Sequence, residues 1–549
     1  MSAPDMHDSF AHWVATADRI RATTKRLEKL AALAEYLPTL DDASLAIASR
    51  FFSGIVFARH DARTTKVGGS ILWSALLAAS GADEAALGEA YSRHGDSGDM
   101  VGDVLARQPG SGHSLAWLEE RFASLATAKG TTARRTIVQE TLTELGASEA
   151  RYFAKLLGGE LRIGLKEAQV EEALARAFAR PVDAVRHANL LRGDIGEVAA
   201  LARRDELSSA RLALFHPLGF MLAQPLATPD EIIDAMPSPF AAEDKFDGIR
   251  AQAHIMGDEV RLYSRTLDDI SHGYPEVLAA LRGLGDGLVL DGELIAEDPS
   301  TTRRARPFAT LQKRLGRKAP GSAILAELPV AFVAYDLIAQ DEELVIGEAY
   351  SGRRSRLMSF KWPVSGAWLA SSTLISSNDD IEREFERART EGNEGLILKD
   401  PASHYTPGRR GKTWVKLKRA LATLDVVVTG VERGHGRRNG VLSDYTFAVR
   451  ASESDDSLLN VGKAYNGLTD VEIAELTERF KAITIERHGR FHLVRPEVVI
   501  EVTFDIVQPS KRHKAGYALR FPRIVRIRDD KTVSDIDTLA RVRELAGDA

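Results

Sequence analysis

The chain has 549 residues, which is more than one hydrophobic core usually serves, so two to four domains are expected. A hydrophobic fraction of 44% and a charged fraction of 27% exclude a disordered or fibrous chain, and without a long apolar stretch or an N-terminal signal we expect a cytoplasmic protein with no membrane partner. The net charge of −6 argues against binding nucleic acid by bulk charge, and the lack of cysteine excludes disulfides, thiolate zinc sites, Fe–S clusters and cysteine nucleophiles.

The first part of the chain has the apolar spacing of α-helices. From Phe10 to Leu37, apolar residues recur at steps of three or four, and Pro38 ends the run. Segments rich in alanine and leucine predict further helices at Ile71–Ser80, Leu115–Ala128, Arg134–Leu145 and Val170–Ala179. We therefore expect an all-helical domain over residues 1–215.

The sequence changes character between His216 and Phe240, where prolines interrupt an apolar stretch that cannot form one helix. We interpret this stretch as the linker into a second domain, residues 216–419. Short β-rich runs alternate there with helical runs, which predicts an α+β domain. The expected strands are Ile249–Ile255, Val260–Ser264, Gly287–Ala296, Pro329–Ile338 and Gly395–Lys399, and the expected helices are Pro275–Gly283, Pro307–Leu315 and Asp380–Glu391.

After Ala420 the pattern is almost entirely that of β-strands. One helix is expected at Asp470–Ile483, and the expected strands are Leu424–Val431, Tyr445–Val449, Leu458–Val461, Val498–Phe504 and Arg520–Ile527. This combination is typical of a small β-barrel such as an OB-fold, which we place at residues 420–549.

Positive charge is concentrated in two segments, although the whole chain is acidic. Between Lys399 and Arg419 the basic residues are opposed by Asp400 alone, and between Lys511 and Arg528 no acidic residue occurs. A solvated charged face is the alternative interpretation of each segment. Focused cationic surfaces of this kind suit the binding of phosphate groups.

The central domain contains a Lys-x-Asp-Gly motif, Lys245 to Gly248, at a strand-to-turn stretch. Three specified residues occur by chance on the order of once in twenty chains of this length, so the motif alone is weak. Further motifs follow it in order: Ser264-Arg265, Asp291-Gly292-Glu293, Tyr335-Asp336, Glu394 to Lys399, Trp414 to Lys418, and Arg520 to Lys531. Chance does not supply such an ordered set.

These motifs resemble the nucleotidyltransferase motifs of covalent ligases and capping enzymes, and the sequence around them is similar to that of ATP-dependent DNA ligases. The resemblance extends to Pro217–Leu226 and Leu161–Leu165, which look like parts of the larger three-domain ligases. It implies a multidomain fold: an all-α DNA-binding domain, an α+β nucleotidyltransferase domain that carries out adenylation, and a β-barrel OB-fold domain. It also implies ATP and Mg²⁺ as cofactors and nicked double-stranded DNA as the partner of a monomer.

The resemblance makes Lys245 the catalytic residue, whose neutral amine would form a phosphoramidate with AMP. Glu243 would accept from the edge of adenine. Tyr335, at a position that is often phenylalanine in the family, would stack on the base. The other implied nucleotide-binding residues are Arg250 and Arg265 on the nucleotide and the 5′-phosphate, Glu293 on the ribose, and Arg410, Lys416 and Lys418 on phosphate oxygens.

The transfer of a nucleotide also needs divalent metal ions that offset phosphate charge. Mg²⁺ prefers carboxylate oxygens, so Glu394 is the first candidate metal ligand and Glu293 the second. The resemblance further implies that the C-terminal basic run closes over pyrophosphate in the first step and then moves away.

Several other functions fit the sequence less well. An NAD-dependent ligase uses the same lysine chemistry but usually carries a four-cysteine zinc site, and this chain has no cysteine. An mRNA guanylyltransferase needs no helical domain ahead of the motif, and an RNA ligase is a similar, weaker alternative. A non-catalytic DNA clamp should show a broken motif set, whereas Lys245, Glu293, Glu394 and Lys416 are all present. We therefore expect an ATP-dependent DNA ligase.

Overall fold

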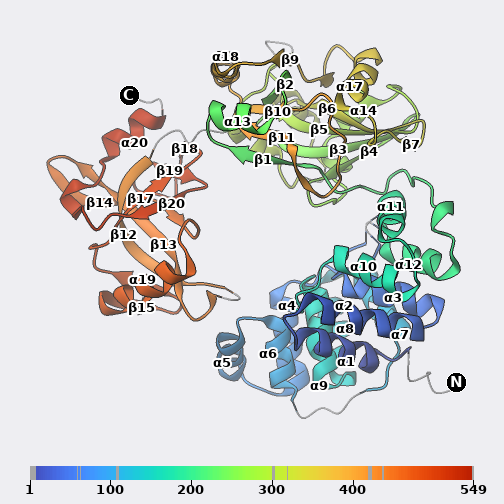
Figure 1. Cartoon of the computed structure of the whole chain (residues 1–549). Coiled ribbons are helices and arrows are strands. Elements are labelled where there is room, and N and C mark those ends of the chain that lie inside the picture. Colours follow the sequence, from blue (N-terminus) through green and yellow to red (C-terminus); the bar gives the residue numbers. More distant parts are fainter. Residues whose placement is uncertain are drawn as a thin grey trace. The chain divides into compact units, whose positions relative to one another are not determined.

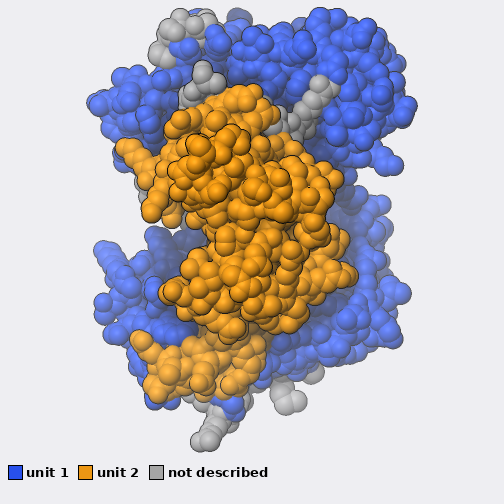
Figure 2. All heavy atoms as spheres, turned by 90° about the vertical axis from the view of Figure 1, so that its left-hand side faces the viewer, with its two compact units in different colours: residues 1–81, 105–418 blue, residues 82–104, 419–549 orange. Residues whose placement is uncertain are grey.

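The structure, a computed structural model, describes residues 8–58, 60–61, 63–106, 111–298, 303–317, 319–417, 423–435 and 438–546. By its contacts the chain divides into two compact units, residues 1–81 with 105–418 and residues 82–104 with 419–549 (Figure 2). Within the described part, no helix is both long and apolar enough to cross a membrane.

The N-terminal region is helical, as predicted (Figure 1). The helices α5 (Glu84–His94) and α6 (Ser97–Val104) belong by their contacts to the second unit. The remaining helices are α1 Phe10–Arg21, α2 Arg26–Tyr36, α3 Asp42–Phe52, α4 Gly69–Ser80, α7 Leu115–Thr127, α8 Gly130–Glu144, α9 Ala147–Leu157, α10 Glu167–Ala177, α11 Val182–Arg192 and α12 Ile195–Arg204.

The predicted apolar run from Phe10 to Leu37 contains a break, so that it forms α1 and α2 rather than one helix. At the break, the hydroxyl of Thr23 accepts from the backbone N–H of Lys25 (3.1 Å) and donates to Glu28 (2.6 Å). A threonine hydroxyl that bonds to the nearby backbone offers it an alternative to the helix. Apolar spacing continues across such a break and does not reveal it.

The central domain is built on two sheets and is α+β, as predicted (Figure 1). The first sheet has the strand order β1-β11-β10-β2-β9, with β1 Leu222–Leu226, β2 Phe240–Lys245, β9 Ser372–Ile375, β10 Gly395–Lys399 and β11 Arg410–Leu417. The second has the order β4-β3-β5-β6-β7 with β8 beside β6, and comprises β3 Ile249–Met256, β4 Glu259–Ser264, β5 Leu288–Ala296, β6 Val330–Gln340, β7 Glu343–Leu344 and β8 Ala367–Leu369. The helices are α13 Pro229–Ala235, α14 Pro275–Leu281, α15 Phe308–Leu311, α16 Ser322–Glu327, α17 Tyr350–Ser359 and α18 Asn378–Thr390.

One face of each sheet packs against helices and forms a hydrophobic core. Phe240 and Leu396 of the first sheet pack with residues of α13 and α18, while Ala251 and Leu290 of the second pack with residues of α14 and α17. Because side chains alternate along a strand, the residues between these core positions lie on the other face of each sheet. They are Glu243, Lys245, Ile397, Lys399, Trp414 and Lys416 in the first sheet, and Arg250, Glu293 and Tyr335 in the second.

The proline-rich stretch from His216 to Phe240 contains regular elements and is more than a linker. It includes β1, which pairs in parallel with β11 at the edge of the first sheet, and α13. An edge strand tolerates Pro225 because one side of its backbone needs no ladder bond. Pro229 occupies the first turn of α13 behind the capping residue Thr228, where a missing N–H costs nothing.

The backbone that leads into β1 is held by side chains of the second sheet. The N–H of Phe215 donates to Nδ1 of His254 (3.0 Å), and the amide of Gln252 accepts from the N–H of Leu218 (2.8 Å) and donates to its carbonyl (3.2 Å). His254 is fully buried, and this burial lowers its pKa to about 3. The imidazole is therefore a neutral hydrogen-bond acceptor at neutral pH.

We expect His254 to make the protein less stable in mild acid. Its pKa in the folded state lies below its ordinary value of 6.5, so its contribution to stability is complete above about pH 6.5 and is lost as the pH falls toward 3. Between pH 7 and pH 5 the free energy of unfolding should fall by about 2 kcal/mol from this group. His254→Asn keeps an acceptor but does not titrate, so its thermal unfolding should depend less on pH. Equal pH dependence in the two proteins would argue against this role.

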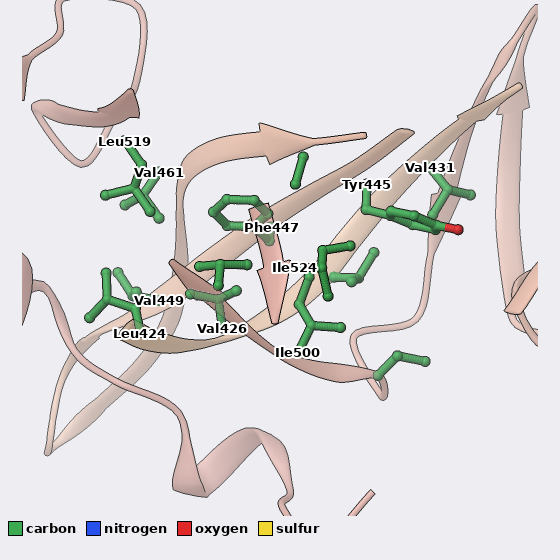
Figure 3. Close-up of a cluster of buried hydrophobic side chains, with 14 of the residues drawn as sticks. Leu424, Val426, Val431, Tyr445, Phe447, Val449, Val461, Ile500, Leu519 and Ile524 are labelled. Carbon is green, nitrogen blue, oxygen red and sulfur yellow. The ribbon is translucent and has the colours of Figure 1, made fainter. Parts of the chain in front are cut away.

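The C-terminal domain is rich in strands and is of the predicted OB type. Its central strand β12 (Thr423–Arg433) pairs with β13, β16 and β17, and Val426, Phe447 and Ile500 from these strands contribute to its core (Figure 3). The helix α19 (Asp470–Ala482) is present as predicted. The other elements are β13 Leu442–Ser452, β14 Asp455–Ala464, β15 Thr484–His488, β16 Phe491–Val494, β17 Val499–Thr503, β18 Ile506–Pro509, β19 Tyr517–Arg520, β20 Arg523–Ile527 and α20 Leu539–Ala546.

The strands β15, β16, β18 and β19 were not predicted; the predicted strand Arg520–Ile527 corresponds to β20 and includes only the last residue of β19. β15 is almost wholly exposed along its length, so its sequence has no alternation of apolar and polar residues. β18 and β19 form a separate two-stranded sheet. Apolar and polar residues alternate in a strand that buries one face. A strand without a buried face shows no such alternation and is missed by this criterion.

Candidate active site

A cavity of about 180 Å³ lies against the faces of the two central sheets that are opposite those packed on α13, α14, α17 and α18. Every predicted nucleotide-binding residue within the described part of the chain lines it: Glu243, Lys245, Arg250, Arg265, Glu293, Tyr335, Arg410 and Lys416. Lys418, which was also predicted to bind phosphate, lies outside the described residues. These residues come from five strands that are far apart in sequence and, for Arg265, from the turn after β4, and they meet at one place.

Lys245 is the last residue of β2, and the chain turns at Gly248 into β3. A Cβ atom at Gly248 would collide with the backbone oxygen of Leu294 and would lie 2.7 Å from Cγ of Glu293. The glycine thus lets the turn pack directly against β5. The glycine of the Lys-x-Asp-Gly motif is therefore required by the packing of the turn against β5, independently of any role in the chemistry.

The amine of Lys245 faces a carboxylate. Its Nζ donates to Oε2 of Glu394, and the exposed fractions of the two side chains are 21% and 20%. The next residue, Gly395, pairs with Lys245 in the ladder between β10 and β2, and its φ of +150° excludes most side chains. A Cβ there would collide with the carbonyl oxygen of Leu417. The pairing of β10 with β2 therefore places Glu394 next to Lys245.

Glu243 is buried in a set of hydrogen-bond donors, although its carboxylate lines the cavity. Oε2 lies 2.7 Å from Nζ of Lys399, and Oε1 accepts from the hydroxyl of Tyr350. The guanidinium of Arg354 is 3.5 Å from the same Oε1. The ammonium and the phenol thus compensate the carboxylate inside the protein, as buried charges require.

Arg250 is held in a fixed orientation on the second sheet. Its guanidinium binds Asp291 with two bonds of 3.1 and 2.7 Å, and Asp291 also accepts from the hydroxyl of Tyr405 (2.7 Å). The same guanidinium lies 4.7 Å from the centroid of the Phe220 ring and 5.8 Å from that of Tyr335. A fork held in this way can present its remaining N–H groups to an anion without losing side-chain entropy.

Comparison with known proteins gives the family. Three family models match in chain order: DNA ligase N terminus over residues 9–175, ATP dependent DNA ligase domain over residues 220–418, and ATP dependent DNA ligase C terminal region over residues 438–531. A protein named probable DNA ligase from Koribacter versatilis is 46% identical, with 96% of this chain and 95% of that protein aligned. The chain belongs to the ATP-dependent DNA ligase family. It is therefore an enzyme of a family that uses ATP and acts on DNA.

Other relatives agree with this membership. A DNA ligase from Methanoculleus marisnigri is 34% identical over 98% of both chains. The solved structure Pmar-Lig_PreS3 has a TM-score of 0.60 at 17% identity and covers 94% of this chain and 99% of its own, which supports the same overall fold. The predicted family and fold class are confirmed.

Glu293 has a high pKa for a carboxyl group of the ligase. Its burial raises its pKa to about 8, and the nearby Lys245 and Arg250 offset only part of that effect. The raised pKa favours the protonated form of this carboxyl group near neutral pH. It can then donate a hydrogen bond, and a bound cation would convert it to a carboxylate ligand.

Lys399 and Trp414 line the cavity and Tyr350 supports it from behind Glu243, and none of the three was predicted as a site residue. Lys399 was counted as part of a cationic surface, but it is fully buried, with its ammonium 4.2 Å from the centroid of the Trp414 ring. Strand alternation could have placed Lys399 and Trp414 on the face of Ile397. Tyr350 comes from α17, and no pattern in the sequence connects it with Glu243.

Several cations of the C-terminal basic run, Arg520 to Lys531, form ion pairs that its sequence does not predict. Arg528 binds Asp425 (2.9 Å), Lys531 binds the same carboxylate (2.5 Å), and Arg526 binds Glu501 (2.6 Å). Asp425 comes from β12, 103 residues before Arg528, and Glu501 comes from β17, 25 residues before Arg526. The run has no acidic residue of its own before Asp529, but the fold supplies partners from neighbouring strands.

Proposed function

We propose that this ligase seals nicks in double-stranded DNA through an AMP attached to Nζ of Lys245. The observation that carries the proposal is the amine of Lys245 at the wall of a cavity that also contains an aromatic ring, buried carboxyl groups and several cations. Such a set of groups can hold a base, a ribose and phosphates around one nucleophile. Because one chain lines the whole cavity, we also propose that the working enzyme is a monomer.

The proposed reaction has three steps, each of which transfers a phosphoryl-linked group. Nζ of Lys245 attacks the α-phosphorus of ATP, a P–N bond forms, and the P–O bond to pyrophosphate breaks. An oxygen of the 5′-phosphate at the nick then attacks the same phosphorus and releases the lysine. Finally, the 3′-hydroxyl attacks the 5′-phosphorus, which joins the strands and releases AMP. The amine must lose a proton before the first step, and Oε2 of Glu394 is placed to receive it.

The other side chains would bind and orient the nucleotide. Glu243 would accept from the 6-amino group of adenine, Tyr335 would stack on the base, and Glu293 would bind a ribose hydroxyl. The cations would neutralise phosphate oxygens as charge develops on them, and they are Arg250, Arg265, Arg410, Lys416 and Lys418. Support for this assignment comes from the positions of the described residues around the cavity.

Glu293, which lines the cavity, and Glu394, which accepts from Lys245 of the cavity wall, fit a Mg²⁺ ion that binds together with the nucleotide. Among the described residues, no group of three or more His, Cys, Asp or Glu side chains is arranged to hold a metal ion. Mg²⁺ commonly uses one or two carboxylates, several waters and substrate phosphates instead, and Glu394 and Glu293 could supply the carboxylates. When bound, the ion would offset the charge of the phosphates.

Replacement of Glu394 tests this assignment. We expect Glu394→Gln to raise the Mg²⁺ concentration needed for half-maximal adenylation by at least about tenfold, because a carboxylate ligand is lost. The measurement is the rate of lysine adenylation across a Mg²⁺ titration, with the exposed Glu386→Gln on α18 as the matched control. A lower rate with an unchanged Mg²⁺ requirement would mean that Glu394 acts on Lys245 and does not bind the metal.

One assay tests the proposed function as a whole. The protein is incubated with ATP or GTP labelled at the α-phosphate and with Mg²⁺, the labelled residue is identified by mass spectrometry, and nicked duplex DNA is then added. We expect label from ATP on Lys245, followed by its disappearance and by sealed DNA. Label from GTP alone, or on another residue, would overturn the proposal. Label on Lys245 that nicked DNA does not remove would indicate another acceptor, such as RNA.

A further inference from the structure

The helix α17 carries two side chains to the back of Glu243, away from the cavity. The hydroxyl of Tyr350 donates to Oε1 of Glu243 and is 3.4 Å from the hydroxyl of Ser372, and Arg354 approaches the same Oε1 while donating to the carbonyl of Ala370. Tyr350 itself is buried. The face of Glu243 that is turned from the cavity is thus closed by protein donors.

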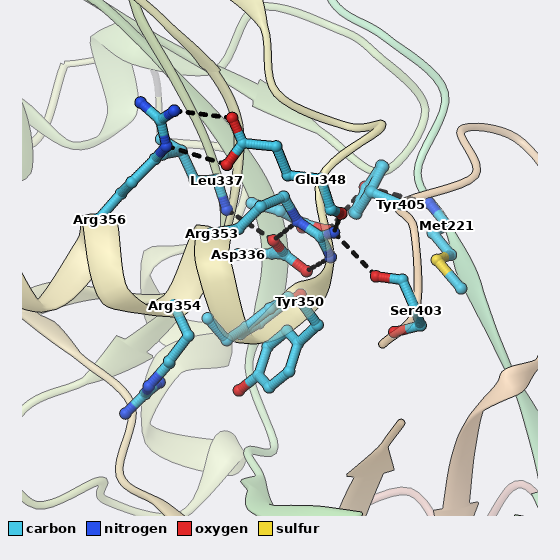
Figure 4. Close-up of polar contacts among 12 residues, drawn as sticks. Met221, Asp336, Leu337, Glu348, Tyr350, Arg353, Arg354, Arg356, Ser403 and Tyr405 are labelled. Carbon is cyan, nitrogen blue, oxygen red and sulfur yellow. Dashed lines mark hydrogen bonds and ion pairs between the residues drawn. The ribbon is translucent and has the colours of Figure 1, made fainter. Parts of the chain in front are cut away.

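The position of α17 is fixed by a buried ion pair. Arg353 binds Asp336 with bonds of 2.7 and 2.9 Å and donates to the carbonyls of Glu348 (2.6 Å) and Ser403 (3.0 Å). Figure 4 shows Arg353 pointing toward Asp336 and Ser403, whereas Tyr350 and Arg354 point together to another side of the helix. The backbone N–H of Tyr350 also donates to Ser403 (2.8 Å), in the loop after β10. Tyr350 and Lys399 are therefore held relative to each other.

These contacts decide which hydrogen bonds remain open on Glu243. A carboxylate has about four acceptor positions and no donor when it is ionised. Lys399 occupies one position on Oε2, whereas Tyr350 and, at 3.5 Å, Arg354 occupy two on Oε1, so one position on Oε2 stays open. Burial and the adjacent carboxylate raise the pKa of Tyr350, so that its hydroxyl remains a donor. An open position on an ionised carboxylate can only accept a hydrogen bond, which suits an amino group and repels a carbonyl oxygen.

We propose that Tyr350 is a positioning residue for the choice of nucleobase, because its hydroxyl holds the Glu243 carboxylate as an acceptor directed at the 6-amino group of adenine. This inference rests on the proposed function, in which Glu243 binds adenine. Guanine has an oxygen at the same ring position, so a fixed acceptor disfavours it. Without the hydroxyl, the carboxylate can turn about its side-chain bonds, and the discrimination weakens.

The test compares three nucleotides in the wild type and in Tyr350→Phe. The nucleotides are ATP, GTP and purine riboside triphosphate, which lacks the 6-amino group. The measured quantity is kcat/KM for transfer of the nucleoside monophosphate from each of them to Lys245. For Tyr350→Phe with ATP we expect a decrease of roughly tenfold, mainly through KM, as for the loss of a hydrogen bond to a charged group. The value for purine riboside triphosphate should change less than about twofold, because that nucleotide makes no bond to Glu243. The preference for ATP over GTP should fall.

Tyr152→Phe in the N-terminal region is the matched control. The hydroxyl of Tyr152 likewise donates to a carboxylate, that of Asp18, at 2.7 Å, but Tyr152 does not line the cavity and does not contact Glu243. We expect Tyr152→Phe to leave the ratio of kcat/KM for ATP to kcat/KM for purine riboside triphosphate unchanged. An unchanged ratio in Tyr350→Phe, or equal changes in both variants, would overturn the inference even though Lys245 is labelled. Wild-type label on a residue other than Lys245 would instead overturn the proposed function.

Discussion

Replacement of Lys245 by alanine is expected to abolish covalent labelling of the ligase by ATP, with a loss of more than about a thousandfold in overall sealing. No other group in the proposed site would replace the amine, because the neighbouring cations are assigned to phosphate and Lys399 is buried against Glu243. The measurement is the amount of labelled protein at saturating ATP, together with the rate at which nicked duplex is sealed. Retained label at the wild-type level would contradict the role of Lys245.

The same variant should keep the last step of the reaction. A nick that already carries AMP on its 5′-phosphate needs no lysine adenylate, so Lys245→Ala should still seal it. Lys361→Ala, an exposed lysine of the same domain, is the control for nonspecific loss and should behave as wild type in both assays. Failure of Lys245→Ala on the adenylated nick would indicate a damaged fold and not a missing nucleophile.

The second large effect concerns the stability of the central domain. Asp336 and Arg353 form an ion pair in which both side chains are fully buried, with exposed fractions of 0% each. Asp336→Ala leaves the guanidinium buried without its counter-charge, and we expect this to lower the free energy of unfolding by about 3–5 kcal/mol. The corresponding shift of the thermal transition of this domain is roughly 10 °C downward.

A neighbouring ion pair on the same helix provides the control. Arg356 binds Glu348 at 2.7 Å, but the exposed fractions of the two side chains are 42% and 38%. Solvent screens such a pair, so Arg356→Ala should cost less than about 1 kcal/mol. Because α17 also carries Tyr350, Asp336→Ala should weaken adenine selection as well, whereas Arg356→Ala should not. Similar transition temperatures for the two variants would contradict the role assigned to the buried pair.

The elements with one buried face could be predicted from the sequence with good accuracy. The strands Ile249–Met256, Leu288–Ala296 and Val330–Gln340 alternate or are continuously apolar, and they were predicted within a few residues. The break between α1 and α2 and the exposed strand β15 were not predicted. A local hydroxyl bond causes the first, and the second has no apolar side. Neither leaves a periodic signal in the sequence.

The resemblance to a family indicated candidate site residues that lie far apart along the chain and that no local sequence pattern relates to one another. Lys245, Glu293, Tyr335 and Lys416 are on four different strands. Side chains alternate between the two faces of a strand, which explains why these four share one cavity once the strand order of the sheets is known. The sequence could not show that Lys399 belongs with Glu243, because a lysine at a strand end is usually exposed. Its ion pair exists only because β10 and β2 are neighbours.

The sequence by itself determined the family, the order of an all-helical, an α+β and a strand-rich region, and the lysine that begins the proposed chemistry. Ordered motifs and periodic apolar residues are local properties, and a sequence records them directly. Only the tertiary structure decided which charges are free and which are paired: Glu394 with Lys245, Glu243 with Lys399 and Tyr350, and Asp425 with Arg528. These pairings depend on strand order and helix docking, which bring together charges that are far apart along the chain.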